Sequence, residues 1–305
     1  MGLLRRVFER FRRGGGGRRG GLGVAELARR VGMSEAELRA VRVEYREFAV
    51  PKRGGGARRL AAPARPLKSV QRRILRRVLA RPLAHEAAVG FERGRSFVHH
   101  AAFHAGRAVV IRIDVRDFFP STGAERVRAL MRRLGWDAEA ADLLVRLCTY
   151  KGGLPQGAPT SPRLANLVNW DLDARCAAVA ARVGARYSRY ADDLTFSLER
   201  DDREAVGRIL RSARWILREC GYQMHVKKKL HIRRRHQRQE VTGLVVNDGP
   251  PRLPRRVRRW LRAVEHRIAM GGAAGRATLT PAQLAGWRAL AGMVERQAVE
   301  GESGG

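Results

Sequence analysis

The chain has 305 residues, 44% of them hydrophobic, which is enough for about two domains with a sizeable core. Its formal net charge of +33 indicates a polyanionic partner, with nucleic acid the first candidate and a membrane surface the second. The sequence contains no apolar run of bilayer length and no signal-peptide pattern, so we expect a cytoplasmic protein without a membrane partner. Cys148, Cys176 and Cys220 have neither a zinc-site spacing nor that of a disulfide framework.

The N-terminal part is predicted to be helical after a basic tail. Residues 1–21 are mostly Arg and Gly, which predicts a flexible tail with salt-sensitive affinity for phosphates. From Val24 to Val43 the pattern predicts two helices joined at Gly32, with Ser34 as N-cap and Glu37 completing a capping box. A helix-turn-helix that binds DNA has the same pattern, and so does a simple packed helical hairpin.

A glycine turn follows between two extended segments over residues 45–63. Basic side chains on such a ribbon, Lys52 and Arg58 among them, can hold a triphosphate because Arg offers paired donors to phosphate oxygens; the alternative is a solvated basic loop. Residues 67–79 then repeat apolar positions at helical spacing, which predicts a helix with one apolar and one basic face. A further helix is expected to start at Phe97.

Residues 108–114 form the clearest candidate for a buried strand, and Asp114 stands at its carboxyl end. Burying an unpaired carboxylate is costly, so an acid at that position indicates function rather than packing. Pro120 is expected to end regular structure soon afterwards.

Two helices are predicted next, over 123–134 and 137–150, followed by a loop rich in Pro and Gly over 152–162. This loop can present Gln156 to a nucleotide or a template base. The pattern over 163–183 predicts one long helix, in which Asp171 and Asp173 are expected to be solvated.

The segments 185–189 and 194–198 predict a hairpin with Asp192 and Asp193 at its turn. Adjacent carboxylates raise each other's pKa unless a cation lies between them, and magnesium is the ion that carboxylates and substrate phosphates hold together. Asp114 can meet this pair in an antiparallel sheet. Three carboxylates from two strands are the arrangement that two-metal phosphoryl transfer requires.

The remainder of the chain is basic and mostly helical. A helix is expected over 203–220, a strand over 240–246, and two further helices over 255–270 and 281–298. A basic two-helix unit of this kind can grip the backbone of a nucleic-acid duplex.

In this order, Asp114, the Leu-Pro-Gln-Gly run at 154–157 and the Tyr-Ala-Asp-Asp run at 190–193 resemble a reverse transcriptase, specifically a bacterial retron reverse transcriptase. The resemblance covers residues 45–246 and implies an α+β fold, the right-hand polymerase with fingers, a palm of antiparallel sheet backed by helices, and a small helical thumb. The implied domains are a basic flexible tail (1–21), fingers with N-terminal helices (22–106), a palm (107–246, with a fingers-side helical insertion at about 124–150) and a helical thumb with a flexible C-terminus (247–305).

The resemblance also implies roles for individual residues. The implied catalytic residues are Asp114, Asp192 and Asp193, which with Val115 would hold two magnesium ions, or manganese as a substitute. The implied nucleotide-binding residues are Lys52, Arg58, Phe119, Gln156, Gly157 and Lys228. Among these, Phe119 is expected to be the aromatic gate that excludes a 2'-hydroxyl and so favours dNTPs.

Weaker motifs specify the retron branch. Val241-Thr242-Gly243 is similar to the family's Val-Thr-Gly element, and residues 100–104 match its Asn-Ala-x-x-His element except that His100 replaces Asn. His225 stands where an Asn usually precedes the motif lysine by three residues. The implied RNA-binding residues are His100, His104, Val241, Thr242, Gly243, Arg255, Arg256, Arg258 and Arg259.

The implied function is that of an RNA-directed DNA polymerase, a nucleotidyltransferase that uses dNTPs. It would copy a cognate structured noncoding RNA into branched, 2'-primed, single-stranded multicopy DNA, within a retron anti-phage defence system that includes a protein effector. A group II intron-like or diversity-generating reverse transcriptase is the first alternative. An RNA-binding scaffold that sequesters an effector is the second, and the three intact aspartates argue against it.

Overall fold

The computed structural model describes residues 21–51, 56–225, 230–270 and 279–300. Nearly all of the predicted basic tail, as well as Lys52 and Lys228, lies outside these residues. Contacts divide the chain into two units: a first unit over Met1–Ala88, Val115–Arg175 and Trp215–Met224, and a second over Val89–Asp114, Cys176–Arg214 and His225–Gly305. Within the described residues, no helix is long and apolar enough to cross a membrane.

The first unit begins with the predicted helical pair, α2 (Val24–Val31) and α3 (Glu35–Ala40). The capping box is confirmed: the Glu37 backbone N–H donates to Ser34 Oγ at 3.2 Å, and the Ser34 N–H donates to the Glu37 carboxylate at 2.8 Å. The two extended segments are also confirmed, as the antiparallel pair β1 (Tyr45–Pro51) and β2 (Ala57–Pro63).

Helices make up most of the remaining first unit. They are α4 (Arg65–Arg77), α6 (Phe118–Ser121), α7 (Ala124–Arg133), α8 (Ala138–Cys148) and α9 (Ser161–Val168). The expectation that Pro120 ends regular structure is wrong, because it lies inside the four-residue α6. Proline is tolerated there since the first turn of a helix has no intrahelical acceptor for its missing N–H.

The single long helix predicted over 163–183 is also wrong. Asn169 separates α9 from α10 (Trp170–Arg182). The Asn169 side-chain amide donates to the Ala165 carbonyl at 2.8 Å and to the Tyr222 hydroxyl at 2.9 Å, so it bonds outside the regular helical pattern. Asp173 is fully buried rather than solvated. Asp171 is half-exposed, as expected, with Arg175 at 3.7 Å.

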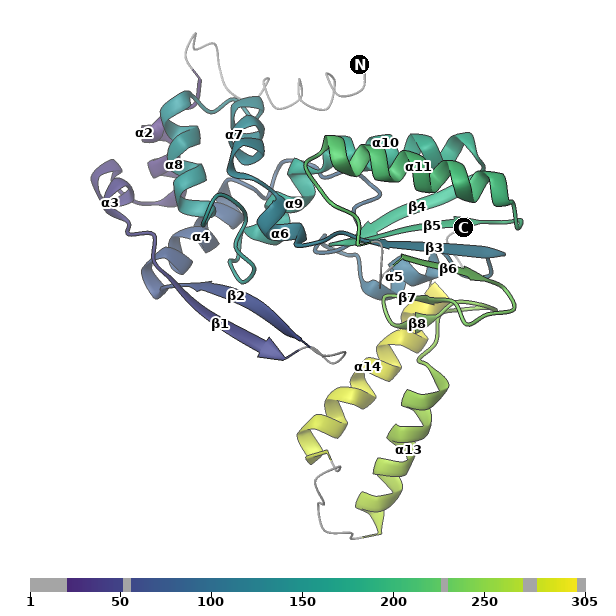
Figure 1. Ribbon diagram of the computed structural model, residues 1–305. Coiled ribbons are helices and arrows are strands. Elements are labelled where there is room, and N and C mark those ends of the chain that lie inside the picture. The colour runs from purple at the N-terminus through teal and green to yellow at the C-terminus, as the bar shows by residue number, and fades with distance from the viewer. Residues whose placement is uncertain (1–20, 52–55, 226–229, 271–278, 301–305) are drawn as a thin grey trace. The chain divides into compact units, whose positions relative to one another are not determined.

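The second unit is built on a four-stranded antiparallel sheet in the order β4-β5-β3-β6 (Figure 1). Its strands are β3 (Val109–Asp114), β4 (Ala185–Tyr190), β5 (Asp193–Leu198) and β6 (Leu230–Arg234). The strand ending at Asp114 and the acidic hairpin are therefore confirmed as neighbours. The edge strand β6 was not predicted, because its alternating apolar and basic residues lie in a strongly basic stretch.

The two faces of this sheet have different chemistry. Ile111, Leu194 and Phe196 lie on one face, along which the parts of α10 and α11 (Arg203–Glu219) belonging to this unit run in Figure 1. The opposite face carries Asp114 and Asp193 and is covered by α5 (Phe97–Ala102) with β7 (Glu240–Val241) and β8 (Leu244–Val245).

The strand predicted over 240–246 is instead the hairpin β7-β8. Thr242 and Gly243, with φ of 47° and 84°, form its turn. Positive φ at two successive residues is the geometry of a tight hairpin loop, which the apolar residues on either side do not reveal by themselves.

The last two predicted helices are confirmed as α13 (Arg255–Ala269) and α14 (Pro281–Glu300). Trp260 and Trp287 pack edge to face between them, with ring centroids 5.3 Å apart. Buried side chains of both helices join a cluster that includes Val98 of α5 and Val110 of β3, so the helical pair is anchored to the polar face of the sheet.

Candidate active site

The three sequence-predicted carboxylates lie at one end of the central strand pair. Asp114 is the register partner of Asp193 across β3 and β5, so the two side chains point to the same face of the sheet. Tyr190 pairs with Asp193, which leaves Ala191 and Asp192 as the turn of the hairpin. The fold therefore brings Asp114 to the acidic pair, as predicted.

The turn itself holds a strained residue. Ala191 has a φ of 56°, in the left-handed region that favours glycine. A side chain at such a φ costs on the order of 1 kcal/mol and persists only where its surroundings impose it.

Those surroundings are specific. The Val89 N–H donates to the Arg189 carbonyl at 2.9 Å, and the fully buried Arg189 donates from Nη1 to the Ala191 carbonyl at 3.1 Å. Gly90 lies so close to the turn that a Cβ added there would be 2.9 Å from the Ala191 nitrogen. The turn is thus held by the Arg189 side chain and by a close backbone approach that leaves no room for a side chain at Gly90.

Arg112 neutralises one of the carboxylates. It precedes Asp114 by two positions on β3, and its guanidinium binds both carboxylate oxygens of Asp193 and donates to the Glu240 carbonyl at 3.2 Å. Burial raises the pKa of Asp193, and the positive charge of Arg112 opposes that rise. Asp193 is thereby fixed in orientation against β7.

A basic hollow of about 310 Å³ lies beside this ion pair, lined by Arg112, His231, Arg233, Arg238 and Glu240. Burial and the neighbouring Arg112 and Arg233 lower the pKa of His231. Glu240 offsets part of the charge through Arg238 at 2.9 Å. The hollow remains net positive and suits an anion.

A chain of buried hydrogen bonds joins α5 to the hairpin. His104 lies 2.7 Å from Ser197 Oγ and 2.8 Å from Ser188 Oγ. Ser188 Oγ lies 3.0 Å from His100 Nδ1, and His100 Nε2 lies 3.3 Å from Thr195 Oγ1. Because Ser188 belongs to β4 and the other two hydroxyls to β5, the histidines clamp the two strands together.

The same two histidines are electrically neutral in the fold. Burial, with a smaller contribution from the charge of Arg112, lowers the pKa of His100 to about 3. The pKa of His104 also falls well below its usual value, mainly through burial, with smaller electrostatic contributions from His100, Arg186 and Arg107. The His100 ring packs against Tyr190, with centroids 5.7 Å apart, next to the acidic turn. Neither side chain has exposed surface, so the expected RNA contact is replaced by contact with the hairpin.

The donor set partly fits a magnesium site. Carboxylate oxygens are the ligands that magnesium prefers. Among the residues that the structure describes, no group of three or more His, Cys, Asp or Glu side chains is arranged to hold a metal ion. Since Asp193 is bound by Arg112, the residues suited to the metal are Asp114 and Asp192, a pair that would share the ion with substrate phosphates. Val115, the other predicted ligand, forms an isolated bridge with Met224.

The predicted nucleotide-binding residues that the structure describes lie in the first unit. Arg58 is exposed on β2, whose Ala61 N–H donates to the Gln156 carbonyl at 2.9 Å. A Cβ on Gly157 would be 2.9 Å from the Ala61 carbonyl oxygen. The Phe119 carbonyl accepts from the Leu154 N–H at 3.2 Å. The 154–157 loop thus contacts both β2 and α6, and brings three of the predicted elements together within this unit.

The predicted RNA-binding residues fall into two groups. The four predicted arginines on α13 are exposed: Arg255, Arg256, Arg258 and Arg259. By contrast, Val241 is fully buried, and Thr242 donates to the Phe97 carbonyl at 2.9 Å. Gly243 is exposed at the hairpin turn.

Sequence reasoning missed Arg112, Arg189 and Gly90. A signal existed for Arg112: it is the one charged residue inside the otherwise apolar strand that ends at Asp114, and residues two apart on a strand share a face. No comparable local signal marks Arg189 or Gly90, whose contacts depend on segments distant in the sequence.

Comparison with known proteins agrees with this geometry. The family model described as reverse transcriptase (RNA-dependent DNA polymerase) matches residues 50–246. The chain therefore belongs to the reverse transcriptase family.

Within that family the chain belongs with the retron reverse transcriptases. It is 37% identical over 284 residues to the retron Mx162 reverse transcriptase of Myxococcus xanthus, covering 80% of this chain and 58% of the relative. It is 35% identical over 229 residues to the retron Ec86 reverse transcriptase of Escherichia coli, covering 74% of this chain and 71% of that relative. The chain thus spans little more than half the length of the Mx162 protein.

Among solved structures, telomerase from Candida albicans matches with a TM-score of 0.52 at 11% identity, over 77% of this chain and 51% of that one. At this identity the likeness concerns the fold alone, a mixed α and β polymerase fold.

Proposed function

We propose that this protein is an RNA-directed DNA polymerase that copies a structured noncoding RNA into DNA. The observation that carries the proposal is the pairing of Asp114 with Asp193 beside a rigidly held Ala191–Asp192 turn, in a chain of the reverse transcriptase family. Carboxylates gathered at the end of a sheet, in a protein of net charge +33, suit chemistry on phosphates.

The reaction is nucleotidyl transfer. A primer hydroxyl attacks the α-phosphorus of a dNTP, a new phosphorus–oxygen bond forms, and pyrophosphate leaves while the hydroxyl proton passes to solvent or a base. Asp114 and Asp192 hold magnesium in the proposal, and the bound ion would stabilise charge on the transferring phosphate. Asp193, held by Arg112, keeps the hairpin in register and fixes the position of its neighbour Asp192.

Other residues take substrate roles in the same proposal. Phe119 gates the sugar, Gln156 and Gly157 line the nucleotide and template site, and Arg58 clasps the triphosphate with Lys52 and Lys228. The exposed arginines of α13 would contact the RNA, as a positively charged helix suits a phosphate backbone.

The finer assignment is to a retron system. We assign fingers to 22–106, a palm to 107–246 and a thumb to 247–305, in the right-hand arrangement. The product would be branched, 2'-primed, single-stranded DNA made on the protein's own noncoding RNA, with a protein effector as partner in anti-phage defence. The relatives named as retron reverse transcriptases support this assignment.

Replacement of Asp192 by Asn tests the proposal. Asp192→Asn removes a proposed metal ligand without changing side-chain size, so dNTP incorporation on a primed RNA template should fall at least about a hundredfold while RNA binding persists. Asp201→Asn is the matched control: it makes the same chemical change in the same unit, at a half-exposed residue paired with Arg234.

Retained incorporation in Asp192→Asn would overturn the site assignment. Sequencing of nucleic acid that copurifies with the wild-type protein tests the retron assignment separately. Branched RNA-DNA is expected, whereas linear cDNA alone would favour a group II intron-like or diversity-generating enzyme. RNA without cDNA would favour a binding scaffold.

A further inference from the structure

Helix α4 of the first unit carries an unusual concentration of positive charge. Its sequence, Arg-Pro-Leu-Lys-Ser-Val-Gln-Arg-Arg-Ile-Leu-Arg-Arg, contains six basic residues and no acidic one. Leu67, Val70 and Ile74 are buried against the rest of the unit. Most of the basic residues therefore lie on the opposite side of the helix, where Arg65, Arg72 and Arg76 are exposed.

Four of these residues form a straight row, which we call the α4 stripe: Arg65, Lys68, Arg72 and Arg76. At about 100° of turn per residue they fall within roughly 80° of one another around the helix. At 1.5 Å of rise per residue the row is about 16 Å long. It thus presents fixed charges over a length comparable to several phosphates of one nucleic-acid strand.

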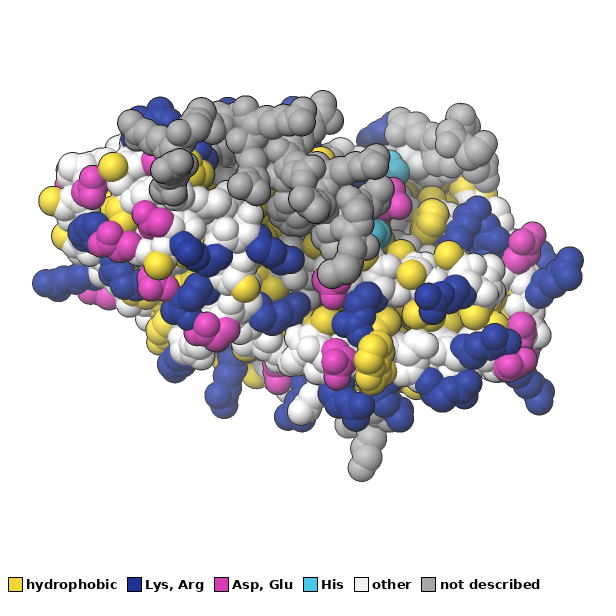
Figure 2. All heavy atoms as spheres, turned by 90° about the horizontal axis from the view of Figure 1, so that it is seen from above, with side chains coloured by type: hydrophobic (Ala, Val, Ile, Leu, Met, Phe, Trp, Pro, Cys, Tyr) yellow, Lys and Arg dark blue, Asp and Glu magenta, His cyan; other side chains and the backbone are white. Residues whose placement is uncertain are grey.

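The α4 stripe differs from several other arginines of the first unit, which form ion pairs with acidic side chains. Arg29 on α2 binds Glu26 at 2.7 Å, and Arg128 on α7 binds Glu125 and Asp142. Figure 2 likewise shows Lys and Arg side chains lying among acidic ones on the face in view. In the part of the chain that the structure describes, no residue of the α4 stripe forms an ion pair.

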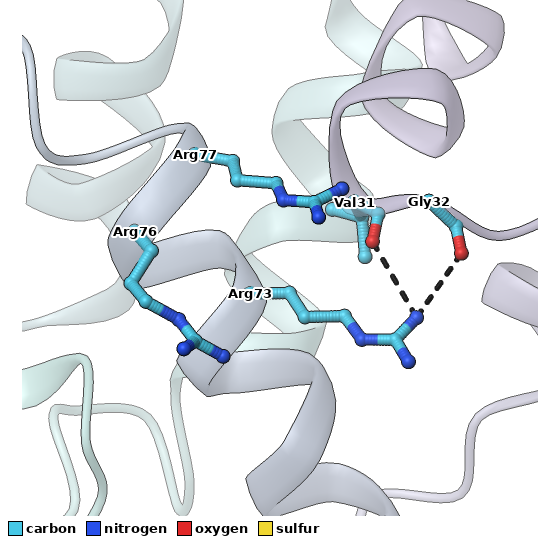
Figure 3. A pocket seen from close by; sticks show the side chains of 5 residues that line it. All are labelled: Val31, Gly32, Arg73, Arg76 and Arg77. Atoms are coloured by element: carbon cyan, nitrogen blue, oxygen red, sulfur yellow. Dashed lines mark hydrogen bonds between the residues drawn. The ribbon is translucent and has the colours of Figure 1, made fainter.

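The C-terminal end of α4 borders a hollow of about 510 Å³, lined by Val31, Gly32, Arg73, Arg76 and Arg77 (Figure 3). Arg73 Nη1 donates to the Gly32 carbonyl at 3.0 Å, and Arg77 Nη1 donates to the Arg30 carbonyl at 3.1 Å. These bonds fix two guanidinium groups at the carbonyl end of α2, and the charge of Arg73 also interacts with the Glu37 carboxylate. Arg76 lies at the same opening, so the α4 stripe ends in a pocket that suits a phosphate.

We propose that the α4 stripe is a binding site for the backbone of double-helical RNA. This proposal rests on the proposed function, since it adds a contact surface in the first unit to the polymerase's RNA partner. The chemistry favours a duplex because α4 contains no aromatic residue, and single strands are held largely by stacking of bases on aromatic side chains. A duplex is held instead through phosphates and sugar hydroxyls, for which a rigid row of cations is suited.

The test compares two double variants of the full chain in RNA binding without dNTPs. Arg72→Gln with Arg76→Gln removes two charges from the α4 stripe. Arg29→Gln with Arg128→Gln removes the same net charge from arginines that are paired with acids, and serves as the control. The probes are a synthetic RNA hairpin with a 20-base-pair stem and a single strand of the same length, each titrated between 50 and 200 mM salt.

The expected result is a shallower salt dependence for the α4 stripe variant on the hairpin. Each phosphate contact contributes about 0.7 to 0.9 to the slope of log affinity against log salt. The fold-loss of hairpin affinity between 50 and 200 mM salt should therefore be about ten times smaller for the α4 stripe variant than for the wild type, because two contacts are lost. The control variant should change little.

The proposal would be overturned by equal effects in the two double variants, by no effect in either, or by an effect confined to the single strand. A wild-type protein that does not bind the hairpin would do the same. None of these results bears on the polymerase assignment, because that assignment is tested by dNTP incorporation in Asp192→Asn. The RNA-binding proposal and the polymerase proposal can therefore fail separately.

Discussion

The two faces of the four-stranded sheet show how one scaffold serves two purposes. On the apolar face Ile111, Ile113 and Phe196 are fully buried against other apolar groups, and this face contributes stability through burial. On the polar face Arg112 binds Asp193, and buried hydroxyls are the hydrogen-bond partners of the clamp histidines His100 and His104. The comparison shows that the fold can bury polar groups beneath the acidic turn when they have hydrogen-bond or ion-pair partners. Removing one such partner should therefore lower the free energy of unfolding more than removing an apolar contact.

The largest expected effect comes from breaking the Arg112–Asp193 ion pair. Arg112→Met keeps much of the side-chain volume but leaves Asp193 buried without a counter-charge. We expect about 3 to 5 kcal/mol of lost stability and at least a hundredfold loss of dNTP incorporation. Urea unfolding and primer extension measure the two.

Arg112→Lys is the informative companion. It retains the charge but cannot bind both carboxylate oxygens in the same way, so it should lie between wild type and Arg112→Met. If Arg112→Met has the free energy of unfolding and the rate of dNTP incorporation of the wild type, the polar face does not depend on the Arg112–Asp193 pair.

An intermediate effect is expected from pH, through the two clamp histidines. Their folded-state pKa values lie below the unfolded value near 6.5, about 3 for His100 and also lowered for His104. The folded state therefore binds fewer protons, so their contribution is fully present above pH 6.5 and is lost as pH falls below it. Between pH 7.5 and 5.5 His100 should remove about 1.4 kcal/mol from the free energy of unfolding, and protonation of His104 should lower it further.

The variant His100→Asn with His104→Gln checks this origin. Both replacements keep hydrogen-bonding groups but do not titrate, so the loss of stability on acidification should shrink by the histidine contribution. His236→Asn, at an exposed position, is the control. An undiminished loss in the double variant would assign the pH dependence to other groups.

The smallest effect is expected at the strained turn. Ala191→Gly removes the Cβ at a φ of 56° and should stabilise the fold by up to about 1 kcal/mol, offset in part by the greater freedom of glycine in the unfolded chain. Thermal unfolding measures the change, and Ala185→Gly, at the start of β4, should destabilise and serves as the control. A destabilised Ala191→Gly would show that the turn is not strained.

Much of the site could be predicted from local sequence. A short, mostly apolar run predicted β3, the flanking strands of Asp192 predicted the hairpin, and Ser34 with Glu37 predicted a helix start. These succeed because periodicity, caps and turns depend on residues a few positions apart. Errors occurred where distant contacts decide: Asn169 breaks a helical pattern partly through Tyr222, and β6 pairs with β3 from more than a hundred residues away.

The sequence by itself determined the helices and strands that depend on local pattern, and it marked three aspartates in polymerase order as the residues proposed to carry the chemistry. Only the tertiary structure decided their partners. Arg112 and Asp193 are 81 residues apart, and His104 lies 84 residues before Ser188. Burial of charged and polar groups is tolerated only when such partners meet, and long-range strand pairing is what brings them together.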